Sequence, residues 1–298
     1  PFVPLPDVVF FKDYRKRSRI HREHFTMELA VSHGLEEAVF YIAMPRNKRD
    51  IFEKQIFSIF PRARVVEKKD DYNPFNQFGA TEAMYGVYQR AAPLPIKTSD
   101  DFTYDPLNIT LASLSKITKE GEGAAIQISV APAGDYHSKR MKAVLSDINK
   151  GKESAGGVFE KHHYEEKVSL WRRFWKSFFK EVGDAFSSGD KKKDDSKDID
   201  SIAVQGVQKK LKNVIVGVNL RVVASARTKE RAKAILNDLE ATFGQYDDAQ
   251  GNRFRFKTVK GRAKKELLRS IIFRTFDRYD DGKFFPTQFM RELFMKMP

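Results

Sequence analysis

The sequence predicts an α+β fold: two ferredoxin-like (split β-α-β) lobes with an antiparallel-rich sheet, interrupted by an amphipathic helical insertion. Strand-like and helix-like segments follow one another in the order β-α-β-β-α-β between Ala38 and Ala131. A strand, a basic turn and an amphipathic helix then recur in residues 214–243, in the same order as in residues 40–59. We interpret this recurrence as an internal duplication that produces the two lobes.

These patterns divide the chain into four parts. Residues 1–24 are predicted to form an extended basic arm, and residues 25–151 the first α+β lobe. Residues 152–200 are predicted to be a flexible insertion that contains a Trp/Phe-rich amphipathic helix. Residues 201–298 are predicted to form the second α+β lobe and C-terminal helices.

The composition is that of a globular chain with a strong basic bias. The chain has 298 residues, of which 41% are hydrophobic, so it can bury a core. The formal net charge of +14 indicates an acidic partner, either nucleic acid or an anionic membrane surface. The absence of cysteine excludes disulfides and thiolate chemistry, and no apolar run reaches the roughly 18 residues that span a bilayer. Because the sequence begins at Pro1, we expect it to be part of a longer protein.

The first lobe begins with a predicted hairpin. Apolar residues alternate in Phe25–Val31, His33 and Gly34 mark a turn, and Ala38–Met44 return as the second strand. A helix over residues 47–59 follows.

The helix at residues 47–59 is expected to present an apolar face. Phe52, Ile56 and Ile59 stand at i, i+4 and i+7. A strand through Val65 and Val66 is predicted after it.

Three further elements complete the first lobe, and one helix follows them. Residues 82–90 read as a strand, a helix is expected to begin at Asp105 and Pro106, and residues 126–130 read as the next strand. A helix that begins at Asp135 and ends at Gly151 follows.

The second lobe repeats the pattern more weakly. The expected elements are a strand over residues 214–224, a helix carrying the apolar residues from Ala232 to Phe243, a strand at 254–256, a helix over 264–276 and a short final helix.

The insertion contains the sharpest local signal, the segment LWRRFWKSFFKEVGDAF. Its apolar face comprises Trp171, Phe174, Trp175, Phe178, Phe179, Val182 and Phe186, and cations including Arg172, Arg173 and Lys176 occupy the other face. A helix of this kind is suited to lie in the surface of an anionic membrane. The alternative is a helix that packs on its own domain or on a partner subunit.

A second basic segment alternates cations with rings. Its residues are Arg253, Arg255 and Lys257, interleaved with Phe254 and Phe256 and followed by Lys260 and Arg262. Such a strip can follow nucleic-acid phosphates. The alternative is the solvent face of a sheet whose phenylalanines fill the core.

We find no pattern that indicates catalysis. The sequence has no phosphate-binding GxxxxGK[ST] loop, no hydrolase elbow and no dinucleotide fingerprint, and its six histidines lack metal-ligand spacing. We therefore expect no enzyme activity, no cofactor, no metal and no small-molecule substrate.

Four stretches resemble the N-terminal region of type IV secretion and conjugation-type ATPases from candidate-phylum bacteria. They are AVFYIAMPRNKRDIFEKQIFSIFPRARVVEKKDDY, PIKTSDDF, DPLNITLASLSKI and GEGAAIQISVAPAG. The resemblance runs from Val8 to Pro298, with residues 152–200 similar only in character. In that family the region precedes a RecA-like motor, so any motor is expected C-terminal to Pro298.

The resemblance implies a non-catalytic, membrane-proximal assembly domain with a cytoplasmic location, peripheral to or anchored at the inner membrane in the full-length protein. The implied partners are secretion-machine subunits or further copies of the chain, and an anionic membrane surface. The alternative function is a basic nucleic-acid-binding domain that guides DNA to a motor. No functional residue carries over, because the family's nucleotide motifs have no counterpart here.

Overall fold

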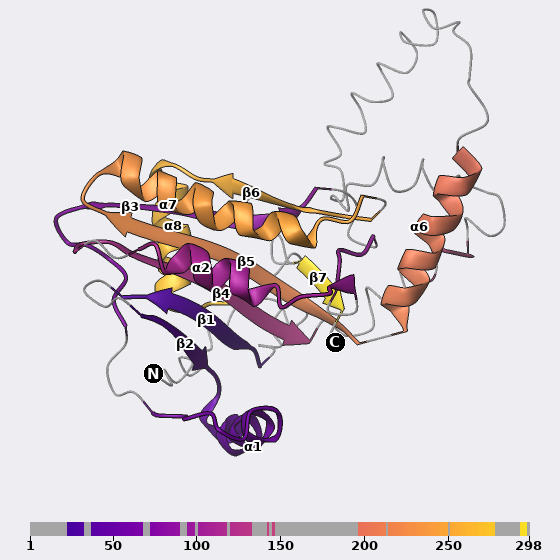
Figure 1. Cartoon of the computed structure of the whole chain (residues 1–298), viewed down its shortest axis with the longest axis horizontal. Coiled ribbons are helices and arrows are strands. Elements are labelled where there is room, and N and C mark those ends of the chain that lie inside the picture. The colour runs from indigo at the N-terminus through magenta and orange to yellow at the C-terminus, as the bar shows by residue number, and fades with distance from the viewer. Residues whose placement is uncertain are drawn as a thin grey trace, which may run out of the picture.

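The computed structural model describes most of both halves of the chain (Figure 1). The described residues are 23–32, 37–67, 72–89, 94–98, 101–117, 120–132, 142, 145–146, 196–212, 214–249, 251–277 and 293–296. The predicted helix of the insertion and almost all of the basic arm lie outside these ranges.

The described strands form one seven-stranded sheet in which every pairing is antiparallel. Its order is β2 (Ala38–Ala43), β1 (Phe25–Val31), β4 (Gly123–Pro132), β5 (Ile215–Ala226), β3 (Ala80–Tyr88) and β6 (Phe254–Thr258), and β7 (Leu293–Lys296) pairs with β5. β2 and β6 are therefore the outermost strands of this described sheet.

The α+β class is confirmed, but the sheet does not divide into two lobes. β3 belongs to the first half of the chain and lies between β5 and β6 of the second half. The physical reason lies in β5, whose twelve residues are all buried. A strand buried on both faces and along its length needs neighbours on both sides, and it recruits β4 on one side and β3 and β7 on the other.

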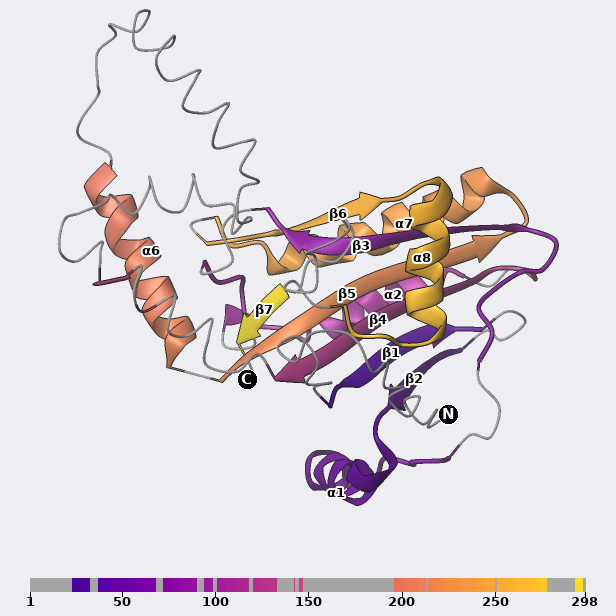
Figure 2. The ribbon, with the colours of Figure 1, turned by 180° about the vertical axis from the view of Figure 1, so that it is seen from behind.

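Helices cover the two faces of the sheet unequally. α2 (Leu107–Leu114) and α7 (Lys229–Ala241) lie on one face, in front of the sheet in Figure 1, and α8 (Gly261–Ile272) lies on the other face (Figure 2). Buried side chains fill both interfaces, with Leu236 and Leu239 of α7 on one side and Leu267 and Ile271 of α8 on the other. The core is thus a sheet between two helical layers.

Two helices lie at the margins of the sheet. The 3-10 helix η1 (Arg46–Lys48) leads into α1 (Arg49–Ile59), which projects beyond β2 (Figure 1). α6 (Ser196–Leu211) begins within the stretch predicted to be flexible. α6 is not among the helices predicted from the sequence, because the charged residues at its start mask the helical period.

Most predicted elements are confirmed at shifted boundaries, and two are wrong. Val65 and Val66 lie in irregular backbone, so the first half contains no complete β-α-β-β-α-β unit. The expected short final helix is replaced by β7, which pairs with the beginning of β5. Short apolar segments of this kind do not reveal whether they form a helix or a strand. The turn at His33 and Gly34 and most of the helix predicted from Asp135 lie outside the described residues.

Candidate interaction surfaces

The basic strip predicted on β6 has the expected alternation. Arg253, just before the outermost strand β6, and Arg255, on that strand, are exposed, and Lys257 is half-buried. Phe254 and Phe256 point to the opposite face, where both rings pack against Phe243, at centroid distances of 5.7 and 4.9 Å. The phenylalanines therefore belong to the core, and the two arginines belong to the surface.

The turn from β6 into α8 adds further cations to this side of the molecule. Lys260 and Arg262 are exposed, and Arg262 Nε lies 3.1 Å from Glu266 Oε1 one helical turn away. Lys264 Nζ lies 3.0 Å from Glu82 Oε1. The structure thus brings all five predicted nucleic-acid contacts, from Arg253 to Arg262, to one edge of the sheet.

The predicted membrane or partner contacts cannot be placed in the same way. Trp171, Phe174, Trp175, Phe178, Phe179, Val182 and Phe186, with Arg172, Arg173 and Lys176, all lie outside the described residues.

Helix α1, predicted to be amphipathic, presents an apolar surface to solvent. None of its eleven residues is buried. Ile59 is 66% exposed, and Ile51 and Phe57 are also exposed, as is Phe60 just after the helix. Phe52 touches the sheet through a T-shaped contact with Phe25, with ring centroids 5.0 Å apart. Phe52 and Ile56 are thus half-buried, whereas Ile51, Phe57 and Ile59 lie in solvent.

The strands beside α1 carry an uncovered apolar strip. Met27 on β1 and Phe40 on β2 share the sheet face that α2 and α7 cover farther along, because Phe40 pairs with Leu29. Phe40 is 59% exposed, and Met27 is 40% exposed. The same chain thus exposes an apolar helix and an apolar patch of sheet.

The other face of the sheet carries a buried polar row that sequence reasoning missed. Glu28, Gln127 and Arg221 stand directly opposite one another on β1, β4 and β5. Gln127 Nε2 donates to Glu28 Oε1 at 2.6 Å, and Arg221 Nη1 donates to Gln127 Oε1 at 2.7 Å. All three side chains are almost fully buried.

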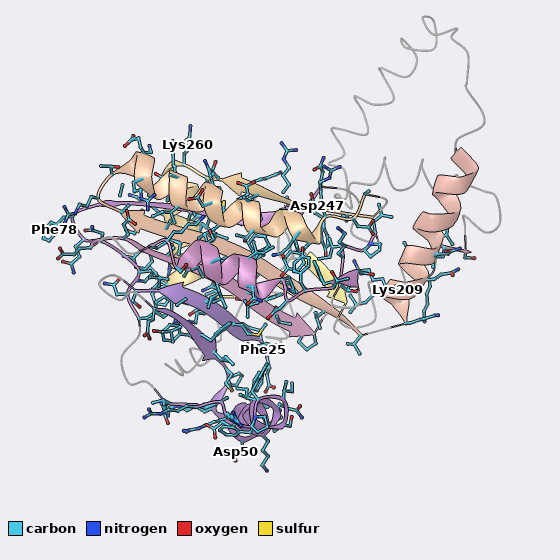
Figure 3. All side chains as sticks on the ribbon, in the orientation of Figure 1. Phe25, Asp50, Phe78, Lys209, Asp247 and Lys260 are labelled. Atoms are coloured by element: carbon cyan, nitrogen blue, oxygen red, sulfur yellow. The ribbon has the colours of Figure 1, made fainter. Side chains whose placement is uncertain are left out.

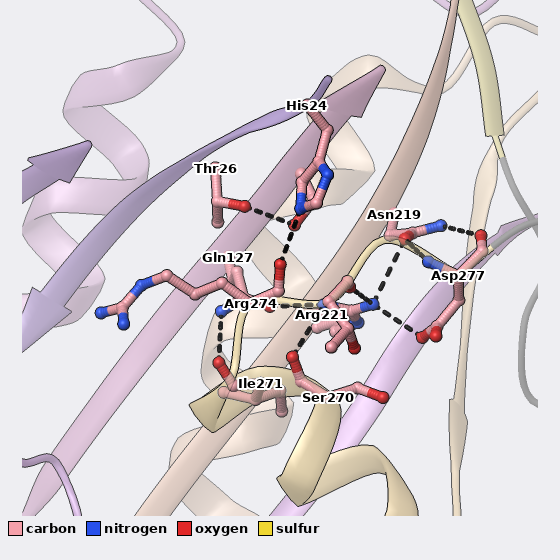
Figure 4. Close-up of polar contacts among 11 residues, drawn as sticks. His24, Thr26, Gln127, Asn219, Arg221, Ser270, Ile271, Arg274 and Asp277 are labelled. Atoms are coloured by element: carbon pink, nitrogen blue, oxygen red, sulfur yellow. Dashed lines mark hydrogen bonds and ion pairs between the residues drawn. The ribbon is translucent and has the colours of Figure 1, made fainter. Parts of the chain in front are cut away.

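The chain after α8 closes over this row (Figure 4). Arg274 Nη2 lies 2.8 Å from Glu28 Oε2, and Arg221 Nη2 lies 2.7 Å from Asp277 Oδ2. Asn219 binds both backbone groups of Asp277, accepting from its N–H at 2.7 Å and donating to its carbonyl at 2.9 Å. His24 Nε2 donates to the Arg274 carbonyl at 2.9 Å. The sheet therefore holds the segment from Arg274 to Asp277 through side-chain bonds.

Arg274 has the conformation that a glycine usually takes at the end of a helix. Its φ is 52°, and the Thr275 N–H bonds the Ser270 carbonyl while the Arg274 N–H bonds the Ile271 carbonyl. This is a Schellman motif with a non-glycine residue in the left-handed position. The strain of that position, about 1 kcal/mol, is offset by the ion pair of Arg274 with Glu28.

The buried network of Glu28, Gln127, Arg221, Arg274 and Asp277, which we call the clasp, joins the segment after α8 to the sheet. Two cations face two carboxylates; Arg221 also donates to the Thr275 carbonyl, and Glu28 also accepts from Gln127. Burial lowers the pKa of Arg221, and Asp277 and Glu28 act in the opposite direction. One signal could have revealed it: Glu28, Gln127 and Arg221 are the largest polar side chains in strands made mostly of apolar residues.

One buried lysine lies outside this network. Lys210 of α6 is buried, and its Nζ lies 5.2 Å from the centroid of the Tyr88 ring. Burial lowers the pKa of Lys210 to about 7, and burial raises the pKa of Tyr88. We assign Lys210 a packing role between α6 and β3, in which the aromatic face stabilises the ammonium form.

Two features of other site types are missing from the described ranges. There, no three His, Cys, Asp or Glu side chains gather closely enough to hold a metal ion. Within the same ranges, no helix has the length and apolar character needed to cross a bilayer.

Comparison with known proteins gives one family. Residues 13–289 match the model of a family described as Domain of unknown function (DUF8128). Neither the search of curated proteins nor the search of solved structures gave a match.

Proposed function

The chain belongs to the DUF8128 family, and we propose that it is a non-catalytic assembly domain whose helix α1 binds a second copy of the same chain. The observation that carries the proposal is that α1 is amphipathic and has no buried residue. An amphipathic helix gains most of its stability in a protein from burying its apolar face. Within the described part of the chain, no residue of α1 is covered to the point of burial.

The second copy is the partner that best fits the exposed surfaces. Each chain offers Ile51, Ile59 and Phe60 around α1, and each also offers Met27 and Phe40 on β1 and β2. In the proposed contact, α1 of one copy lies on the β1–β2 strip of the next, which would cover both surfaces at once. Contiguous apolar patches of this kind mark interaction sites. When such a contact is not reciprocal it builds a ring or a filament, and when it is reciprocal it builds a dimer.

The wider context of the proposal comes from the resemblance to secretion and conjugation ATPases. In that context the domain would position a transfer motor on its membrane complex, in the cytoplasm and at the inner membrane. Other secretion-machine subunits are then further partners of the same surface. Hydrolysis of ATP by the isolated chain would contradict the non-catalytic assignment.

Sedimentation velocity over a range of concentrations tests the proposal. We expect the chain to self-associate reversibly and the variant Ile59→Ser/Phe60→Ser to remain monomeric. The matched control is Lys54→Ser/Gln55→Ser, which changes two exposed polar residues of the same helix and should associate as the parent does. A parent that is monomeric at all concentrations, or a double variant that associates normally, would contradict the proposal.

A second candidate function is nucleic-acid binding along β6, favoured by the exposure of Arg255 on this outermost strand and of Arg253 just before it. Residues two apart on a strand are about 6.6 Å apart, close to the axial rise of two nucleotide steps of a duplex strand. Cations on an outer strand also prevent unwanted strand pairing, which is the competing explanation.

Charge reversal separates these two explanations. If the strip binds phosphates, replacement of Arg253, Arg255 and Lys257 by Glu should abolish retention of DNA. Self-association through α1 should persist in that variant. Equal DNA retention by the parent and the variant at low salt would exclude the strip as a nucleic-acid site.

A further inference from the structure

The loop before β3 holds an aromatic side chain in solvent. Phe78 is 97% exposed, the highest value among the large apolar side chains of the described residues. Asn76 fixes the backbone beneath it: its Oδ1 accepts from the Phe78 N–H at 2.9 Å, and its Nδ2 donates to the Gly121 carbonyl at 2.9 Å. The Asn76 N–H donates to Oγ of the buried Ser225 at 2.8 Å. The loop is thus tied to β5 and to the turn before β4.

Close backbone packing fixes the same loop from the other side. A Cβ atom at Gly79 would lie 2.2 Å from the Ala226 carbonyl oxygen, so only glycine allows this approach. Phe75 packs against the core on the α8 side of the sheet. The loop therefore packs one half-buried phenylalanine on the core and holds the next one, three residues later, in water.

Two cations, Arg227 and Lys229, lie at the same end of the sheet as this loop. Ala226 pairs with Ala80 at the start of β3, so Arg227 follows directly beside the loop, and Lys229 begins α7 at the same end. Figure 3 labels Phe78 and Lys260 at this end of the molecule, well away from Asp50 on α1.

The acidic groups at this end leave a positive excess. Glu120 lies 3.9 Å from Arg227, and with side chains 85% and 74% exposed the pair contributes little. Glu230 is exposed beside Lys229, and Arg262 forms an ion pair with Glu266. Arg227 and Lys260 therefore remain able to meet an external anion.

We propose that the Phe78 loop and the cations at its end of the sheet form a contact site for an anionic lipid bilayer. A single ring on a convex, rigid tip is suited to enter the headgroup boundary, while flanking Lys and Arg side chains meet lipid phosphates. Single-stranded nucleic acid is favoured less, because it is usually held in a groove with several aromatic platforms. The site goes beyond the assembly role, which uses α1 at another part of the surface.

Co-sedimentation of the 298-residue chain with lipid vesicles tests the site. The vesicles contain phosphatidylcholine with or without phosphatidylglycerol. We expect binding only with phosphatidylglycerol, about tenfold weaker for Phe78→Ser, and retained by Phe78→Trp. Arg227→Gln/Lys260→Gln should also bind more weakly, and the difference from the parent should shrink as salt is added.

A variant on α1 supplies the matched control. Phe60 is also an exposed phenylalanine, so Phe60→Ser should weaken self-association and leave vesicle binding unchanged. Because Phe78 makes no core contact, circular dichroism of Phe78→Ser should match the parent. Vesicle binding by Phe78→Ser equal to that of the parent would overturn the site. If the parent did not bind the vesicles but bound single-stranded DNA through Phe78, the lipid site would also be overturned, and a nucleic-acid site would replace it.

Discussion

At the scale of single residues, the most demanding feature is the charge pair between Glu28 and Arg274, whose side chains are 1% and 4% exposed. Removing one partner of such a pair leaves the other charge buried without compensation. We predict that Glu28→Gln lowers the free energy of unfolding by about 3 kcal/mol, measured by urea denaturation.

An exposed pair gives the control for this prediction. Glu120→Gln removes the carboxylate 3.9 Å from Arg227, and it should change the free energy of unfolding by less than about 0.5 kcal/mol. If Glu28→Gln were as mild as Glu120→Gln, the clasp over the sheet would not contribute to stability.

A second residue-scale prediction concerns Lys210. Its pKa falls from 10.5 in the unfolded chain to about 7 in the folded chain, because burial disfavours the charged form. Between these values the unfolded state binds one more proton, so the free energy of unfolding rises with pH, by about 1.4 kcal/mol per pH unit. Below about pH 7 the lysine is protonated in both states, and the burial cost applies in full.

The variant Lys210→Met isolates this effect. We predict that it is more stable than the parent at pH 7 and that the difference between the two shrinks as the pH rises to 10. Urea titrations of both proteins across this range measure it. A difference that does not change with pH would contradict the lowered pKa.

At the scale of elements, substitutions in α1 and α7 should differ in their effect on the free energy of unfolding, although both helices are amphipathic. Ile235 of α7 is buried, whereas Ile59 of α1 is exposed. We predict that Ile235→Ala lowers the free energy of unfolding by about 2–5 kcal/mol. Ile59→Ala should change it by less than about 0.5 kcal/mol, measured at concentrations where the chain is monomeric. A large effect of Ile59→Ala in the monomer would mean that α1 packs on its own domain.

How far the sequence predicts the structure also becomes clear from single elements. The alternation in Phe25–Val31 and the helical period in α7 depend on neighbours a few residues apart, so both elements are correctly predicted. The place of β3 beside β5 depends on residues more than a hundred positions apart, such as Met84 and Val222, and local patterns carry no information about it.

The candidate surfaces show the same limit. The alternation of Arg253 and Arg255 with phenylalanines correctly predicts which side chains are exposed. Helical period alone could not show that the apolar face of α1 has no cover, because that depends on where the helix lies relative to the sheet. Phe78 gave no signal, since a phenylalanine in an irregular segment is ordinarily expected to be buried.

At the scale of the whole molecule, the interleaved sheet implies one cooperative unit. Residues 25–151 alone would leave β4 without β5 and β3 without either neighbour. We predict that this fragment shows no cooperative urea transition, whereas the full chain shows a single one by circular dichroism. A fragment that unfolds cooperatively would support the two independent lobes that the sequence pattern indicated.

The contact between copies is the central claim, and disulfide trapping tests it most directly. The chain contains no cysteine, so each variant with one introduced cysteine carries one thiol. A disulfide forms only where Cβ atoms approach to about 4 Å. Mixing Ile59→Cys with Phe40→Cys under oxidation should give a covalent dimer of the two variants, whereas Lys54→Cys mixed with Phe40→Cys should give little. Equal cross-linking by the two mixtures, or none by either, would contradict the docking of α1 on the β1–β2 strip.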